Sequence, residues 1–191
     1  MKYVDLAQHI HGLRAKRTGR PIGAAMRVSE VWNAAIDCPQ NGISEILYYE
    51  TNLPRPFAGM FFRLVDSTAN REIAAIYVEK NLDNHWKEFI AIKEMMHCWS
   101  PGKSYVGTPK DAEHLVDELC SKSGPYTPKV IADSSAIHAA AEVMLPHFTV
   151  ERQLALGMDS KQIAFSHGLH PEITEMICRF DLLHKRKNGE F

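Results

Sequence analysis

Apolar residues recur close to the helical period in the first part of the chain. The pattern predicts a helix over residues 3–17, which ends at the breaker sequence Gly19–Pro21. A second helix is predicted over about residues 24–36, and Cys38–Gly42 ends it with residues that favour turns. The chain therefore begins with two helices.

The pattern then changes to short apolar runs. Ile43–Tyr49 is apolar and aromatic, and a loop with two prolines follows at residues 52–56. Phe57–Val65 and Ile73–Val78 are apolar runs of strand length, and the polar segment Asp66–Arg71 separates them. Two such runs joined by a polar turn predict an antiparallel hairpin.

Helical spacing returns in the second half of the chain. The pattern predicts helices over about residues 84–98, 111–120 and 133–145, and two or three short helices between Val150 and Leu183. Asp83 or Asn84 is a plausible N-cap for the first of these. Most of the chain after the hairpin is therefore expected to be helical.

The order of these elements indicates an α+β fold, with a small antiparallel sheet packed on helices and an all-helical C-terminal part. We predict an N-terminal helical segment at residues 1–42, a core at residues 43–148 and a C-terminal helical segment at residues 149–191.

The composition is that of an ordinary globular protein. The chain has 191 residues, of which 45% are hydrophobic and 24% charged, and its formal net charge is −1. These values exclude disordered, collagen-like and wholly polybasic nucleic-acid-binding chains. The small net charge conceals an asymmetry. Residues 1–27 hold six Lys or Arg and one acidic residue, for a charge of +5. Residues 179–191 hold four Lys or Arg and two acidic residues, for +2, so residues 28–178 carry −8.

The cellular compartment is predicted from the apolar runs of the sequence and from the spacing of its cysteines. No run approaches roughly 18 consecutive apolar residues, and the N-terminus lacks the apolar core of a secretory signal. The thiols of Cys38, Cys98, Cys120 and Cys178 are widely spaced and form no CxxC pair. We expect a cytoplasmic protein with reduced thiols and no membrane partner.

Candidate chemistry lies in the Lys93–His97 sequence, KEMMH, within the predicted helix. In an HExxH helix, two histidines four positions apart bind zinc, and the glutamate beside them acts as general base on the bound water. Here Glu94 and His97 keep their positions, but Lys93 replaces the first histidine. A charged ammonium has no lone pair to offer a metal.

Together with its surroundings, this segment resembles the ImmA/IrrE family of zinc-metallopeptidase-like proteins. Family members have a strand hairpin of small residues followed by a motif like R-x-F-T-x-A-H-E-x-x-H; here Lys87 lies near the Arg and Phe89 matches the Phe. Residues 133–146 resemble a second family segment, E-x-x-A-N-x-F-A-A-x-L-L-M-P, whose leading Glu is the third zinc ligand. Asp133 takes that position, and the resemblance covers roughly residues 43–180.

The resemblance implies a zincin-like core at residues 43–148. In an active member, His97 and Asp133 would bind Zn²⁺ and Glu94 would be the general base. Two departures weaken that expectation, because Lys93 removes one ligand and Asp133 is one methylene shorter than Glu.

Two physical alternatives follow from these departures. The Lys93 ammonium could replace the missing cation and pair with Glu94 or Asp133, which would otherwise be buried acids without a partner. Alternatively, a shifted metal site could use His97 and Asp133 with a further ligand, either Cys98 or His138.

The other histidines offer little by spacing alone. His9 and His11 are expected to be solvated on a basic helix, and His85 to cap or flank the motif helix. Three further histidines have no potential ligand partner at a suitable spacing in the sequence: His114, His147 and His184.

The segment Met158–Ile173 has the pattern of a helix-turn-helix. A DNA-binding recognition helix would need basic or amide side chains at its start, whereas this chain supplies Glu172 and Glu175, which phosphate would repel. The pattern favours a packing module. The basic end His184–Lys187 is expected to be a solvated tail, able at most to assist a phosphate contact.

Three functions remain open at this point. The first is a catalytically degenerate metallopeptidase-like protein without a cofactor, which acts in regulation or stress response by binding a protein. The second is an active zinc-dependent endopeptidase that cleaves a regulator protein. The third is a DNA-associated regulator that uses the C-terminal helices.

Overall fold

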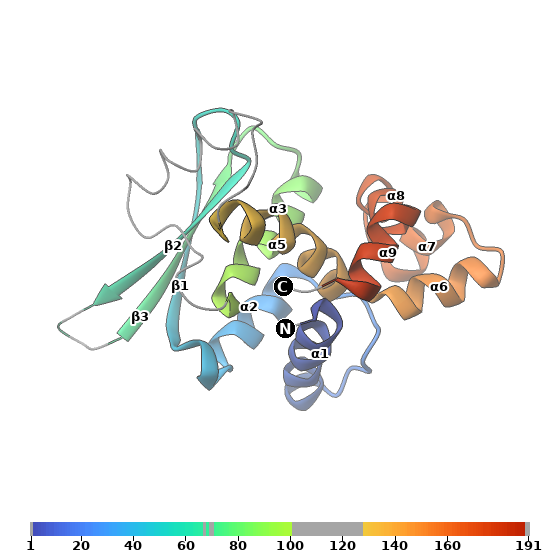
Figure 1. The fold of residues 1–191 in the computed structure, drawn as a ribbon, viewed down its shortest axis with the longest axis horizontal. Coiled ribbons are helices and arrows are strands. Elements are labelled where there is room, and N and C mark those ends of the chain that lie inside the picture. Colours follow the sequence, from blue (N-terminus) through green and yellow to red (C-terminus); the bar gives the residue numbers. More distant parts are fainter. Residues whose placement is uncertain (1, 67, 69–70, 101–127, 190–191) are drawn as a thin grey trace.

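The computed structural model describes residues 2–66, 68, 71–100 and 128–189. The helix predicted over residues 111–120, with His114 and Cys120, lies outside these ranges. Within them the protein is an α+β structure, which confirms the predicted class (Figure 1). A small sheet lies at one end, the C-terminal helices lie at the other, and a central group of helices lies between them.

The sheet consists of β1 (Ile43–Thr51), β2 (Gly59–Asp66) and β3 (Arg71–Glu79), in the order β1-β3-β2. β2 and β3 form the predicted antiparallel hairpin, with Phe61 opposite Ile76. The prediction of a wholly antiparallel sheet is wrong, because β1 pairs with β3 in parallel.

The composition of the strands explains this arrangement. β3 carries a run of buried apolar side chains, Ala74 to Ile76 and Val78, and so suits the central position between two neighbours. β2 keeps Leu64 and Val65 exposed and lies at an edge. β3 lies between the other two strands and runs parallel to β1 and antiparallel to β2.

The central helices are α1 (Tyr3–Thr18), α2 (Val28–Ile36), α3 (Asn84–Met96) and α5 (Pro128–Met144). Short 3₁₀ turns follow α2 at Pro39–Asn41 and α3 at His97–Trp99. α3 packs against β2, β3 and α5, and α2 packs against β1. The alanines at 136 and 139–141 of α5 are fully buried, so neighbouring helices approach α5 closely.

The C-terminal part contains α6 (His147–Ala155), α7 (Ser160–His167), α8 (Pro171–Cys178) and α9 (Phe180–Asn188). The described part of this region therefore contains four helices, whereas the sequence predicted two or three. Asp159 caps α7 by accepting a hydrogen bond from the Gln162 N–H at 2.8 Å, and Gly168, at φ 62°, makes the turn to α8.

The prediction of a solvated basic tail is wrong for Arg186. This residue lies in α9 and is completely buried. Its guanidinium donates to the Glu142 carboxylate at 2.9 Å and to the carbonyl oxygens of Leu145 and Ile177 at 2.8 and 3.2 Å. A basic residue of the last helix is therefore part of the core.

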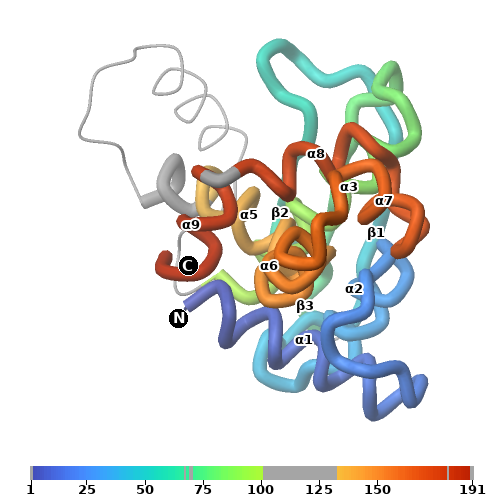
Figure 2. The backbone as a smooth tube through the Cα atoms, turned by 90° about the vertical axis from the view of Figure 1, so that its right-hand side faces the viewer, coloured from blue at the N-terminus to red at the C-terminus, as the bar shows by residue number. Residues whose placement is uncertain are grey.

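The two ends of the chain meet. Figure 2 shows the termini side by side, and the Tyr3 N–H donates to the Gly189 carbonyl at 3.4 Å. α1 contacts both α5 and α9, so the N-terminal segment packs against both later parts of the chain. The predicted boundaries near residues 42 and 148 stay predictions. None of the helices in the described ranges is long and apolar enough to span a bilayer.

Candidate functional site

The site residues of the KEMMH sequence lie at the end of α3, where it faces α5. Lys93, Glu94 and His97 are 6%, 1% and 5% exposed. α5 brings Asp133, which is partly exposed, to the same place because α3 and α5 pack against each other. The structure therefore brings together all four residues that the sequence predicted for this site.

Lys93 is the centre of these four residues, Lys93, Glu94, His97 and Asp133, which we call the Lys93 group. Its Nζ donates to Glu94 Oε1 at 2.9 Å and to Asp133 Oδ1. His97 Nε2 lies 3.8 Å from Asp133 Oδ1 and 3.8 Å from Glu94 Oε2. The ammonium thus contacts both carboxylates, and the imidazole lies at the edge of the pair.

The charges of the group stabilise one another. Burial by itself would lower the pKa of Lys93, but the carboxylates of Glu94 and Asp133 outweigh burial and raise that pKa above its ordinary value. Burial acts to raise the pKa of Asp133, yet His97 and Lys93 together hold it well below its usual range. A protonated Lys93 between two carboxylates is the state that this geometry favours.

β2 closes the group on its apolar side. The Phe61 ring lies 5.6 Å from the His97 ring, centre to centre, and Ser100 Oγ lies 3.4 Å from His97 Nδ1. A methyl group on Gly59 would come within 2.5 Å of Glu94 Oε1 and of Ile90 Cγ2. Only a residue without a side chain allows the strand to pass this close to Glu94.

Zinc, which the family resemblance implies, does not fit this arrangement. Ligand atoms of Glu94, His97 and Asp133 all lie within 4.8 Å of one another, as a metal site would require. However, the Lys93 ammonium already binds two of these three groups and would repel a cation. The donor set suits an internal cation and leaves no place for a second one.

The shifted metal site does not form among the described residues. Cys98 is buried away from the group, and burial raises the pKa of its thiol to about 12, so it stays a neutral thiol. The His138 ring stacks on Tyr3, and its Nδ1 lies 3.0 Å from the Ser134 carbonyl oxygen. Neither residue joins Asp133 and His97.

The sequence interpretation missed a second group of ligand-type side chains. His85, in the first turn of α3, meets His170 and Glu172 at the start of α8. His85 is 85 positions from His170 and 87 from Glu172, so no spacing rule could have joined it to them. The expectation that His11 is solvated was also wrong, since this residue is fully buried in α1.

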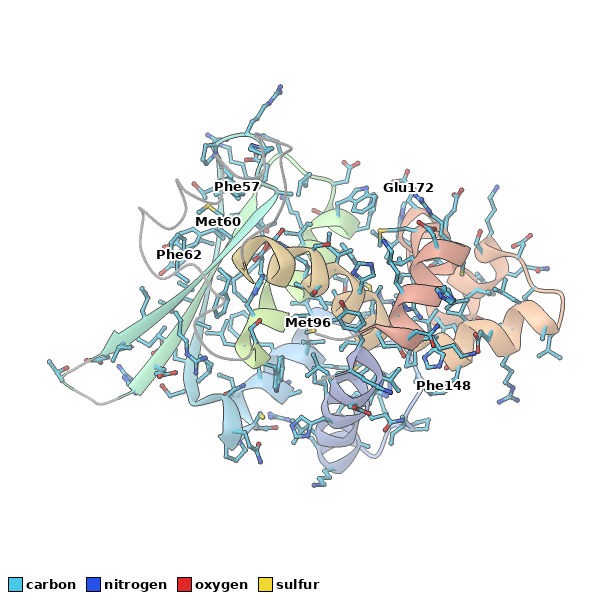
Figure 3. The ribbon with its side chains drawn as sticks, viewed as in Figure 1. Phe57, Met60, Phe62, Met96, Phe148 and Glu172 are labelled. Atoms are coloured by element: carbon cyan, nitrogen blue, oxygen red, sulfur yellow. The ribbon has the colours of Figure 1, made fainter. Side chains whose placement is uncertain are left out.

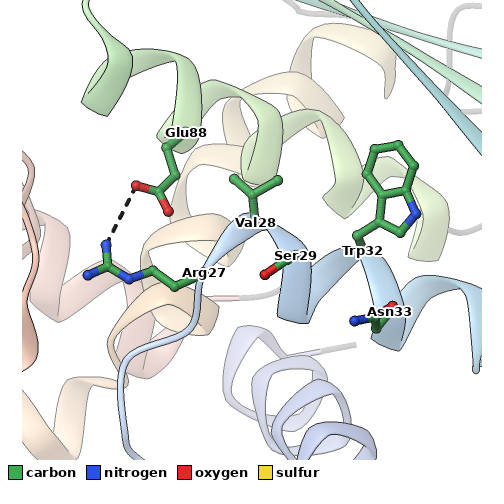
Figure 4. A pocket seen from close by; sticks show the side chains of 6 residues that line it. All are labelled: Arg27, Val28, Ser29, Trp32, Asn33 and Glu88. Carbon is green, nitrogen blue, oxygen red and sulfur yellow. Dashed lines mark ion pairs between the residues drawn. The ribbon is translucent and has the colours of Figure 1, made fainter.

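A separate open groove of about 550 Å³ lies where α2 faces α3 (Figure 4). Arg27 and Glu88 pair across it at 3.6 Å, and Val28 and Trp32 supply apolar surface. The groove includes none of the residues of the Lys93 group.

Comparison of the chain with protein-family models, with curated proteins and with solved structures finds no match.

Proposed function

We propose that the protein is a catalytically degenerate, metallopeptidase-like protein that acts in regulation or stress response by binding another protein. The observation that carries this proposal is the Lys93 ammonium, which contacts Glu94 and Asp133 where the resemblance would put a metal. The ammonium and the two carboxylates already pair with one another in this arrangement.

Charge balance supports the same conclusion. One ammonium faces two carboxylates, so a divalent ion in the same place would have to displace Lys93 or deprotonate it. Both routes are costly, because Lys93 is buried and the two carboxylates hold it in the charged form.

Replacing the lysine tests this proposal. Lys93→His restores the HExxH pattern and should create zinc affinity that the unmodified protein lacks at this group. Zinc per chain is measured by elemental analysis after purification without added metal, and Zn²⁺ affinity by titration. Lys87→His, on the same helix, is the matched control and should give no such gain.

Two outcomes would contradict the proposal. Stoichiometric zinc in the unmodified protein, lost in His97→Ala, would mean that the group binds metal despite Lys93. Protease activity that is abolished by Glu94→Gln would support the second candidate, a zinc-dependent endopeptidase. That candidate is kept because Glu94, His97 and Asp133 offer ligand atoms within 4.8 Å of one another.

Exposed apolar side chains support the binding part of the proposal. Phe165 of α7 is 91% exposed and Leu156, just after α6, is 72% exposed. The Gln153 side-chain amide of α6 donates to Ser166 Oγ of α7 at 3.3 Å, so the two helices are neighbours. We expect a partner to crosslink to the unmodified protein in the native cell but not to the Phe165→Ser variant. Lys161→Ser changes an exposed residue on the same helix and should leave the crosslinking unchanged. Equal crosslinking by both variants would exclude this surface.

A further inference from the structure

The second ligand group lies where the C-terminal helices meet α3. The rings of His85 and His170 stack with their centres 3.6 Å apart and their planes 9° apart. His85 Nε2 lies 3.1 Å from Glu172 Oε2. Each of the three side chains offers a ligand atom, and these atoms all lie within 4.8 Å of one another.

A fourth residue holds the carboxylate in place. The Trp86 indole N–H donates to Glu172 Oε2 at 3.2 Å, so this carboxylate is oriented by a neighbour of His85. Hydrogen bonds of this kind commonly orient the ligands of metal sites. In Figure 3, Glu172 lies at the top of the C-terminal helices, on the side of α3.

The group is open to solvent, which distinguishes it from the Lys93 group. Glu172 is 60% exposed at its side chain and His170 is also exposed, so an ion could enter and keep water as a further ligand. Among the described residues, no lysine or arginine forms an ion pair with Glu172; its partner there is the His85 imidazole.

We propose that His85, His170 and Glu172 form a site for a divalent transition-metal ion, with Zn²⁺ as the reference ion. Two imidazoles and one carboxylate form a common donor set for this class of ion. The ion takes the place of the proton in the hydrogen bond between His85 Nε2 and Glu172 Oε2, and that proton is released to water. The stacked rings turn so that one nitrogen of each faces the ion. The donor atoms need to approach to roughly 3.3 Å of one another, which side-chain rotation provides.

Such an ion would join two parts of the fold. His85 belongs to α3, whereas His170 is the N-cap of α8 and Glu172 lies in its first turn. Binding would therefore stabilise the docking of the C-terminal helices on α3. This inference does not depend on the fate of the Lys93 group, since the two groups share no residue.

The test uses the full chain, stripped of metal by chelation and titrated with Zn²⁺ alone. We expect saturable binding of one ion per chain, and a rise in Tm when zinc is added. His170→Asn keeps a residue suited to the N-cap of α8 but removes the ligand, and Glu172→Gln removes the carboxylate charge. Each variant should weaken zinc binding at least about tenfold and lose the rise in Tm.

Two controls locate the ion. His184→Asn changes an exposed histidine of α9 and should leave zinc affinity unchanged. Circular dichroism confirms that each variant is folded. The proposal is overturned if the full chain shows no saturable binding, or if His170→Asn and Glu172→Gln bind zinc as tightly as the unmodified chain. It is equally overturned if His97→Asn, rather than His170→Asn, removes the ion.

Discussion

Several ionisable side chains of this protein are buried, and each has a specific partner. Lys93 contacts two carboxylates, and His11 lies between the Val143 carbonyl oxygen, 2.9 Å from Nε2, and Arg14 Nη2, 3.2 Å from Nδ1. The arginine can only donate, so Nδ1 accepts and Nε2 carries the proton. The hydrogen bonds thus define one neutral tautomer of His11.

The first residue-scale prediction concerns Lys93→Met. This variant leaves Glu94 buried without its cation, so we expect the free energy of unfolding to fall by about 3–5 kcal/mol, measured by urea denaturation at neutral pH. Lys87→Met removes an ion pair to the exposed Glu50 and should cost less than about 1 kcal/mol. Equal losses in the two variants would show that Lys93 is not needed to neutralise the group.

The second concerns the pH dependence of stability. Burial, followed by the charge of Arg14, lowers the pKa of His11 to about 4 from its ordinary value of 6.5. Between these values the unfolded chain binds a proton that the folded protein does not, so stability should fall as pH decreases from 6.5 to 4. The full effect is on the order of 3 kcal/mol.

The contribution of His11 is isolated by comparison with His11→Gln. Urea denaturation of both proteins at several pH values should give a shallower pH dependence for the variant. Parallel curves would mean that His11 does not titrate with a lowered pKa.

Residue-scale predictability depended on distance along the chain. Lys93, Glu94 and His97 lie within about one helical turn, so their proximity followed from the helical pattern. Asp133 was placed beside them only through the family resemblance. The contact between His85 and His170 depends on how α8 docks on α3, which local pattern does not encode.

At the scale of elements, α5 links helices from different parts of the chain. It contacts α1, α3 and α9, and its residue Glu142 holds a buried pair with Arg186 of α9. Glu142 also accepts from His147, through Nδ1 at 2.7 Å and the backbone N–H at 3.0 Å. One carboxylate therefore connects α5 with the start of α6 and with α9.

Arg186→Met tests the connection between α5 and α9. The change leaves Glu142 buried without its cation, and we expect a loss of about 3–5 kcal/mol in the free energy of unfolding. Lys187→Met, which removes an exposed pair to Glu151 at 3.1 Å, is the matched control and should cost less than about 1 kcal/mol. The double change Arg186→Met with Glu142→Leu should recover part of the loss, and no recovery would contradict the assigned role.

The elements themselves were predicted better than their arrangement. The β2–β3 hairpin followed from two apolar runs and a polar turn, since its contacts are local. The parallel pairing of β1 with β3 was missed because strand order depends on which strand is buried on both sides. Arg186 was taken for a solvated residue because a short basic sequence gives no sign of which member turns inward.

At the scale of the whole molecule, the C-terminal helices have the order of a helix-turn-helix, yet they are docked on the rest of the protein. α8 would be the recognition helix, and its first residues contact α3 through the hydrogen bonds that Glu172 accepts from His85 and Trp86. A recognition helix needs those positions free to enter the major groove. Here Glu172 is held on α3 while its side chain stays 60% exposed, so a carboxylate faces the side from which phosphate would approach.

This arrangement predicts weak and unspecific behaviour toward DNA. Fluorescence anisotropy with labelled duplexes should show no sequence preference, and any binding at low salt should vanish at about physiological ionic strength. Truncation of the basic end is an unsuitable control, because it would remove the buried Arg186 along with the exposed charges.

The double variant Lys185→Ala with Lys187→Ala is the suitable control, because it changes exposed residues alone. Sequence-specific binding that survives physiological salt and is lost in Glu175→Arg would contradict the prediction, since it would place the exposed face of α8 against DNA.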